Sequence, residues 1–160
     1  MSIVLHSRRK PGTDGLGWTP LVSVVAEGGF AVSQDGAVQI IDLSYRQIKI
    51  GVAPQVVRAL QDAGVLDRDD VQQIISQRTL ERRLANAEAL RPEESDGIAR
   101  LLRVIAHANR VFEDADLAEE WLRSPNPALN DEVPMVMAAR DVGAREVEGV
   151  LTRLEHGVFD

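Results

Sequence analysis

The chain has 160 residues, a formal net charge of −7, 44% apolar residues and no cysteine. That length suits one ordinary domain or two small modules, and the apolar fraction suffices for a buried core. Without cysteine, neither a disulfide framework nor a thiolate metal site can form. No apolar run approaches the roughly eighteen residues of a membrane span, and no secretion signal is evident, so we expect a cytoplasmic protein that does not contact a membrane.

The negative charge is concentrated in the last part of the chain. Lys and Arg against Asp and Glu number five against four in residues 1–53, six against six in residues 54–91, and seven against fifteen in residues 92–160. An acidic segment repels nucleic acid and attracts cationic surfaces. If the protein binds DNA, we therefore expect the earlier part of the chain to do so.

The beginning of the chain predicts an arm or extension. Residues 1–20 contain three of the twelve glycines and show no apolar periodicity. Alternating apolar residues on either side of Gln34-Asp35-Gly36 favour a small β-hairpin over residues 30–41, with a helix as the alternative. A role in packing or dimerisation is the simplest interpretation of this segment.

Capping residues predict a series of short helices in the next part. Ser44 can cap a helix that Gly51 ends, and Pro54 can begin another that stops at Gly64. Asp67 is a good N-cap for a third helix. Its buried face would consist of Val71, Ile74 and Ile75. Helices this short need tertiary packing to persist in water.

The following helix, expected from Gln77 to about Leu90 after an N-cap at Ser76, has two distinct faces. At about 100° per residue, Leu80, Leu84 and Ala87 form an apolar face, and a cationic, hydrogen-bonding face lies beside it. A short helix, a tight turn and a helix with such a stripe are typical of a helix-turn-helix, which lays its second helix in the major groove of DNA. The side chains expected to face DNA are Arg78, Thr79, Arg82, Arg83 and Asn86.

A solvated helix face is the alternative interpretation of this polar stripe. Its arginines would then pair with Glu81 and Glu88 instead of DNA. Helix-turn-helix spacing is a weak signal by itself. The balanced charge of residues 54–91 also predicts modest DNA affinity with few phosphate contacts, unless the protein binds as a dimer or larger complex.

The last seventy residues predict a bundle of helices, which makes the whole chain mainly α. Apolar residues at helical spacing indicate the elements and their buried faces. The expected helices cover residues 92–112, 117–123, 133–139 and 144–156. We expect Gly143 to break the chain before the last helix and Gly157 to cap its C-terminus.

No catalytic or metal-binding constellation is evident in the sequence. His6, His107 and His156 are far apart and have no partner at metal-binding spacing, and no phosphate-binding, zinc or nucleophile-elbow motif occurs. The acidic cluster of residues 113–120 lacks the alternating ligands and glycine of a calcium loop. We therefore expect no enzyme activity, no metal and no cofactor.

A series of short motifs marks the last part of the chain. They are Val111-Phe112, Ala118 with Trp121-Leu122, Pro125-Asn126-Pro127-Ala128-Leu129, Pro134-Met135, Gly143 and Arg153-Leu154-Glu155-His156-Gly157. Together they resemble the C-terminal toxin-binding domain of the Xre/MbcA/ParS type of bacterial antitoxin, and residues 44–89 resemble its Xre-like module more weakly. Asn130-Asp131 stands where that family usually has glycine, so we expect this loop to turn through an asparagine in the left-handed region.

The resemblance implies an antitoxin that occludes the active site of a cognate toxin and represses its own operon. Such toxins commonly belong to the RES-domain, ParT-like class, which consumes NAD or transfers ADP-ribose from it. The implied parts are an arm (1–43), a helix-turn-helix module (44–91) and a toxin-binding helical domain (92–160). The implied partners are the toxin, in a hetero-oligomer, and operator DNA, while a homodimer remains open. The residues expected to face the toxin are Trp121, Leu122, Leu129, Arg153, Phe159 and Asp160.

Simpler interpretations exist for several of these residues. Trp121 and Leu122 are most simply core residues, although a partly exposed Trp121 would be a natural anchor for a partner. Phe159 and Asp160 follow the Gly157 cap, where chain ends usually fray. The resemblance suggests instead that this ring and carboxylate fill a cationic NAD pocket. A stand-alone helix-turn-helix regulator and a protein-interaction module without DNA binding remain alternatives.

Overall fold

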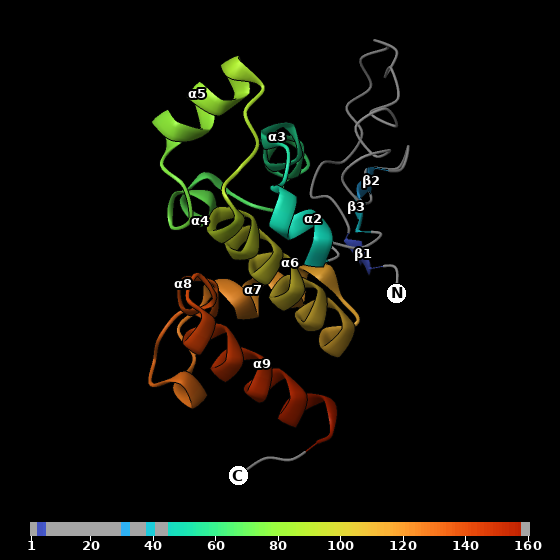
Figure 1. Ribbon diagram of the computed structural model, residues 1–160. Helices are drawn as coiled ribbons and strands as arrows, with labels where there is room; N and C mark the ends of the chain where they lie inside the picture. The colour runs from blue at the N-terminus through green and yellow to red at the C-terminus, as the bar shows by residue number, and fades with distance from the viewer. Residues whose placement is uncertain (1–2, 6–29, 33–37, 41–44, 158–160) are drawn as a thin grey trace. The chain divides into compact units, whose positions relative to one another are not determined.

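The structure is a computed structural model that describes residues 3–5, 30–32, 38–40 and 45–157 (Figure 1). In this part the chain is mainly helical, as the sequence predicts. It forms two compact units, residues 1–95 and 96–160, and the boundary falls inside the long helix α6 (Pro92–Phe112). Among the described helices, none combines the length and the apolar character that a bilayer crossing requires.

A small antiparallel sheet belongs to the first unit. Its strands are β1 (Ile3–Leu5), β2 (Phe30–Val32) and β3 (Val38–Ile40), in the order β1-β3-β2. Phe30 pairs with Ile40 and Val32 with Val38, so the predicted hairpin is confirmed. The sequence does not indicate β1, because three consecutive apolar residues lack the alternation that marks a half-buried strand. The turn at residues 34–36 lies outside the described residues.

Short helices make up the rest of the first unit. They are α2 (Tyr45–Ile50), α3 (Pro54–Asp62), α4 (Arg68–Gln72) and α5 (Gln77–Asn86). Pro54 stands in the first turn of α3 as predicted, whereas the expected cap Ser44 lies outside the described residues. Asp67 caps α4 as predicted: its side chain accepts a hydrogen bond from the Asp70 N–H at 2.8 Å, and the Asp70 side chain accepts one from the Asp67 N–H at 2.9 Å.

Helix α5 ends one turn earlier than predicted. It stops at Asn86 because Ala87 adopts the left-handed conformation, with φ 50° and ψ 36°. The Glu88 N–H then donates to the carbonyl of Arg83 at 2.9 Å, which satisfies one of the last helical carbonyls. Ala87 is exposed and Leu90 is buried, so the predicted apolar face is wrong at position 87.

The core of the first unit explains why such short helices persist. Helices α3, α4 and α5 and the segments between and after them contribute apolar side chains that are almost completely withdrawn from water. These include Val56, Val57, Leu60, Leu66, Val71, Ile75, Leu80 and Leu90. Burial of one such side chain stabilises the fold by about 1.5–3 kcal/mol, which offsets the poor intrinsic stability of a one- or two-turn helix.

The second unit contains the rest of α6 and the elements that follow it. These are α7 (Ala115–Arg123), the 3₁₀ turn η1 (Pro127–Leu129), α8 (Pro134–Ala138) and α9 (Asp141–Glu155). Helix α8 packs against both α7 and α9. The chain turns after η1 through Asn130 at φ 56°, as predicted, and Asp131 follows at φ 61°.

Gly143 lies inside α9, so the prediction that it breaks the chain is wrong. A Cβ atom at this position would lie 2.3 Å from the carbonyl oxygen of Met137. Glycine is therefore needed where the backbones of α8 and α9 approach closely, and the helix continues through it. Gly157, at φ +66°, ends the helical turn as predicted, and its N–H donates to the carbonyl of Leu154 at 3.1 Å.

Candidate functional site

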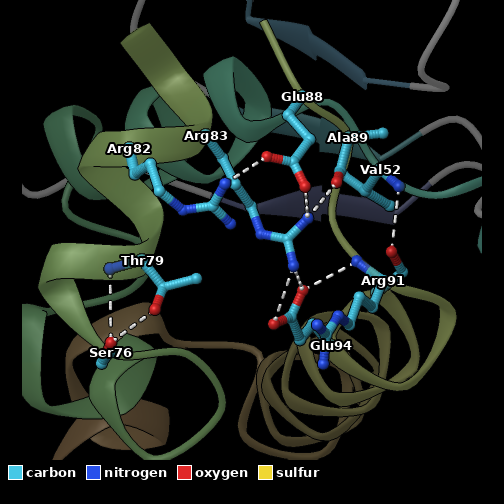
Figure 2. Close-up of polar contacts among 10 residues, drawn as sticks. Val52, Ser76, Thr79, Arg82, Arg83, Glu88, Ala89, Arg91 and Glu94 are labelled. Carbon is cyan, nitrogen blue, oxygen red and sulfur yellow. Dashed lines mark hydrogen bonds and ion pairs between the residues drawn. The ribbon is translucent and has the colours of Figure 1, made fainter. Parts of the chain in front are cut away.

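The polar face of α5 presents most of the side chains that the sequence assigns to DNA. Arg78, Arg82 and Asn86 are exposed, and Thr79 is half-buried. Ser76 caps the helix by accepting a hydrogen bond from the Thr79 N–H at 3.3 Å, and the two hydroxyl oxygens are 2.8 Å apart (Figure 2). The turn before α5 is thus fixed, and a partner can reach the arginines and the asparagine.

Arg83 does not belong to this exposed face. Its side chain is only 3% exposed, it donates to the carbonyl of Ala89, and it forms ion pairs with Glu88 and Glu94 at 3.3 and 3.0 Å (Figure 2). The assignment of Arg83 to DNA is therefore wrong. A helical projection places it at the edge of the polar stripe, but the projection does not show that the chain between α5 and α6 covers it.

Arg82 is exposed and already has an intramolecular partner. Its Nη1 lies 2.6 Å from Oε2 of Glu88, and the two side chains are 52% and 45% exposed. Glu81, the other acidic residue considered as a partner, accepts a hydrogen bond from Gln77 at 2.8 Å. The alternative interpretation of this face, in which arginines pair with acidic residues, is thus correct for Glu88.

Backbone contacts fix the segment that connects α5 to α6. The Leu90 N–H donates to the carbonyl of Val52, and the Val52 N–H donates to the hydroxyl of Ser95, both at 2.9 Å. Gly51, at φ +102°, permits this arrangement, because a Cβ atom there would lie 2.3 Å from the carbonyl oxygen of Leu90. Together with Arg83, these bonds hold α5 in a defined position relative to the first turn of α6.

In the second unit, the residues expected to contact a partner separate into core and surface positions. Leu122 and Leu129 are 4% and 3% exposed, so both are core positions in this structure, and for Leu122 the simpler interpretation as a core residue is confirmed. Trp121 is half-buried, with its ring centroid 5.8 Å from that of Phe112, and Arg153 is exposed on α9. Phe159 and Asp160 lie outside the described residues.

Ion pairs fasten α9 along α6. Arg103 pairs with Glu148 at 2.5 Å and Arg110 with Glu155 at 3.2 Å, while His107 Nε2 lies 3.4 Å from the same Glu155 carboxylate. The hydrogen bond from Arg110, together with its positive charge and His107, holds the pKa of Glu155 below its usual value. The sequence could not indicate these pairs, because their members are 45 or more residues apart.

Three exposed large apolar side chains lie in the described part of the second unit, and the first of them is Leu117 on α7, which is 52% exposed. Val136 on α8 is 52% exposed and Val142 in the first turn of α9 is 70% exposed. Val136 and Val142 directly precede Met137 and Gly143 in the chain, the two residues at which α8 and α9 approach closely. Within the described part of the chain, no group of three or more His, Asp or Glu side chains is arranged to hold a metal ion.

Comparison with known proteins connects this architecture to one family. Residues 107–157 match the family described as the antitoxin Xre/MbcA/ParS C-terminal toxin-binding domain. The chain is 32% identical to an Antitoxin Xre of Pseudomonas putida over 113 residues, 71% of each chain. It is 31% identical to one of Photorhabdus laumondii, over 68% of this chain and 75% of the relative, and 32% identical to one of Yersinia enterocolitica, over 70% and 78%. The chain therefore belongs to the Xre/MbcA/ParS family of antitoxins, and its second unit carries the toxin-binding domain.

Proposed function

We propose that this antitoxin neutralises a toxin of the RES-domain class, which consumes NAD or transfers ADP-ribose, by covering its active site. The match of residues 107–157 to a toxin-binding domain carries the proposal. The acidic excess of residues 92–160 supports it, because we expect a pocket that holds the NAD pyrophosphate to be cationic, and such a pocket would attract this unit at long range. The antitoxin acts by stoichiometric binding and performs no reaction of its own.

The proposed contact surface consists of the side chains that a toxin can reach. Trp121 supplies a half-buried aromatic ring held against Phe112, and such rigid rings are typical anchors of protein interfaces. Arg153, Val136 and Val142 supply a cation and apolar area on α8 and α9. We expect Phe159 and Asp160, beyond the end of α9, to enter the cationic pocket of the toxin.

Removal of Phe159 and Asp160 tests the occlusion step. Cells that produce the toxin with this shortened antitoxin should stop growing, although the two proteins still co-purify through the rest of the surface. Asp160→Asn, which keeps the length and removes one charge, shows how much of the effect is electrostatic. Full neutralisation by the shortened chain would refute the role of these two residues and leave toxin binding intact.

We further propose that the α5 surface binds the promoter DNA of the antitoxin's own operon. Two exposed arginines and Asn86, on a helix whose turn is fixed by Ser76, suit contacts to phosphates and base edges. In gel shifts, Arg78→Ala should weaken binding and reduce its salt dependence, whereas Lys49→Ala, an exposed cation on α2, should have little effect. No shift, alone or with toxin, would leave a protein-interaction module without a repressor role.

A further inference from the structure

We propose that Glu88 limits the DNA affinity of the α5 surface by competing with phosphate for Arg82. The inference rests on the proposed DNA-binding role of α5 and concerns the strength of that binding. Arg82 is one of the two exposed arginines on this face, and its guanidinium is already within 2.6 Å of a carboxylate (Figure 2). A phosphate can interact fully with Arg82 only if it displaces this carboxylate, because the two negative charges repel each other.

Glu88 differs from an ordinary surface partner because it is held from two sides. Its Oε2 contacts Arg82 while its Oε1 contacts Nη1 of Arg83 at 3.3 Å. Arg83 is itself fixed by the carbonyl of Ala89 and by Glu94, which also accepts a hydrogen bond from the Arg91 N–H at 2.7 Å. Arg83 is thus a positioning residue that keeps the Glu88 carboxylate in front of Arg82.

The backbone of Glu88 is fixed as well. Its N–H donates to the carbonyl of Arg83 at 2.9 Å in the turn formed by left-handed Ala87. An exposed ion pair contributes little to stability, because water and salt weaken the attraction and because two long side chains must be ordered to form the pair. Here much of that ordering is already supplied by the turn and by Arg83, so the carboxylate is a more effective competitor than its exposure suggests.

The matched pair Glu88→Gln and Glu81→Gln tests the inference. Both variants remove one negative charge beside α5, but only Glu88 contacts an arginine, while Glu81 bonds to Gln77. In titrations of the full-length protein with duplex DNA from its own promoter, Glu88→Gln should bind about two- to fivefold more tightly than the wild type. Its affinity should also fall more steeply with salt, by about 0.9 in the logarithmic slope, because one more phosphate contact forms.

A double-mutant cycle shows whether the gain acts through Arg82. In an Arg82→Ala background the change Glu88→Gln should add no more than Glu81→Gln does. Glutamine still accepts a hydrogen bond from Arg83, and circular dichroism with thermal melting verifies that each variant folds. Glu88→Ala, which removes the acceptor altogether, serves as a second variant if the glutamine form is unstable.

The possible outcomes separate this inference from the proposed function. Tighter binding by Glu88→Gln than by Glu81→Gln, lost when Arg82 is removed, supports both. Wild-type binding with equal affinities for the two glutamine variants overturns the role of Glu88 and leaves the DNA-binding role standing. Failure of the wild type and of Glu88→Gln to bind the promoter, even at low salt, overturns both.

Discussion

Adjacent arginines on α5 have opposite environments. Arg82 is half-exposed with one carboxylate beside it, whereas Arg83 is 3% exposed and joins the α5–α6 connection to the first turn of α6. A buried cation with several acceptors is costly to remove, because the groups left behind lose their partner. An exposed ion pair contributes little to stability.

Alanine substitutions should therefore have different effects on the free energy of unfolding at Arg82 and at Arg83. We expect Arg83→Ala to lower the free energy of unfolding by about 2–3 kcal/mol, because Glu94 and the carbonyl of Ala89 lose their donor. Arg82→Ala should change it by less than about 1 kcal/mol and act on DNA binding instead. Urea denaturation measures both values, and equal losses would contradict the distinction between a structural and a surface arginine.

The carboxylate of Glu155 should make stability depend on pH. Its pKa is lowered in the folded state, first of all by the hydrogen bond from Arg110. A lowered pKa means that the ionised form favours folding, so this contribution is present above the unfolded-state pKa near 4.5 and is lost as the pH falls through the folded value. Glu155→Gln should lower the melting temperature at pH 7 more than at pH 3, and an equal loss at both pH values would contradict this assignment.

At the scale of the elements, α8 and α9 are joined by a contact that depends on the lack of a side chain. Gly143 allows the α9 backbone to approach the carbonyl of Met137, whereas a Cβ atom on Gly149 would meet only Nη1 of Arg153, at 3.8 Å. The two glycines are therefore in the same helix but in different environments. One is required by packing, and the other carries only the intrinsic cost of glycine in a helix.

Alanine at these two positions should have effects of opposite sign. Gly143→Ala forces α8 and α9 apart and should destabilise the protein by about 1–3 kcal/mol. Gly149→Ala should stabilise it by about 0.5–1 kcal/mol, because alanine is the better helix former. Thermal unfolding followed by circular dichroism measures both, and a stable Gly143→Ala variant would show that the close approach is not needed.

The sequence predicts a helix boundary well where a few neighbouring residues determine that boundary. Pro54, Asp67 and Gly157 begin or end their helices as expected, because capping and positive φ are properties of a few neighbouring residues. The interpretation of Gly143 as a break is wrong because this glycine is required by the close approach of α8, which no local pattern indicates. The sequence did not show that Leu129 and Arg83 are buried, because their burial depends on distant segments, whereas it indicated Leu122 as a core residue and Arg82 as exposed.

At the scale of the whole molecule, the acidic excess and the family match fall on the same part of the chain. Residues 54–91 are balanced in charge and carry the α5 surface, whereas residues 92–160 hold the acidic excess and the toxin-binding domain. The structural boundary after Ser95 lies close to the predicted start of that domain at residue 92. The separate roles of an arm (1–43), a DNA-binding module (44–91) and a toxin-binding domain (92–160) remain a prediction.

We propose above all that the second unit inhibits a toxin by covering its active site. The direct test is to titrate the purified toxin from the neighbouring gene with the full-length antitoxin while following NAD consumption. We predict that activity falls linearly to zero at a fixed stoichiometric ratio, and that a stable complex of the same ratio elutes in gel filtration. Undiminished NAD consumption at excess antitoxin, with the two proteins eluting separately, would contradict the claim.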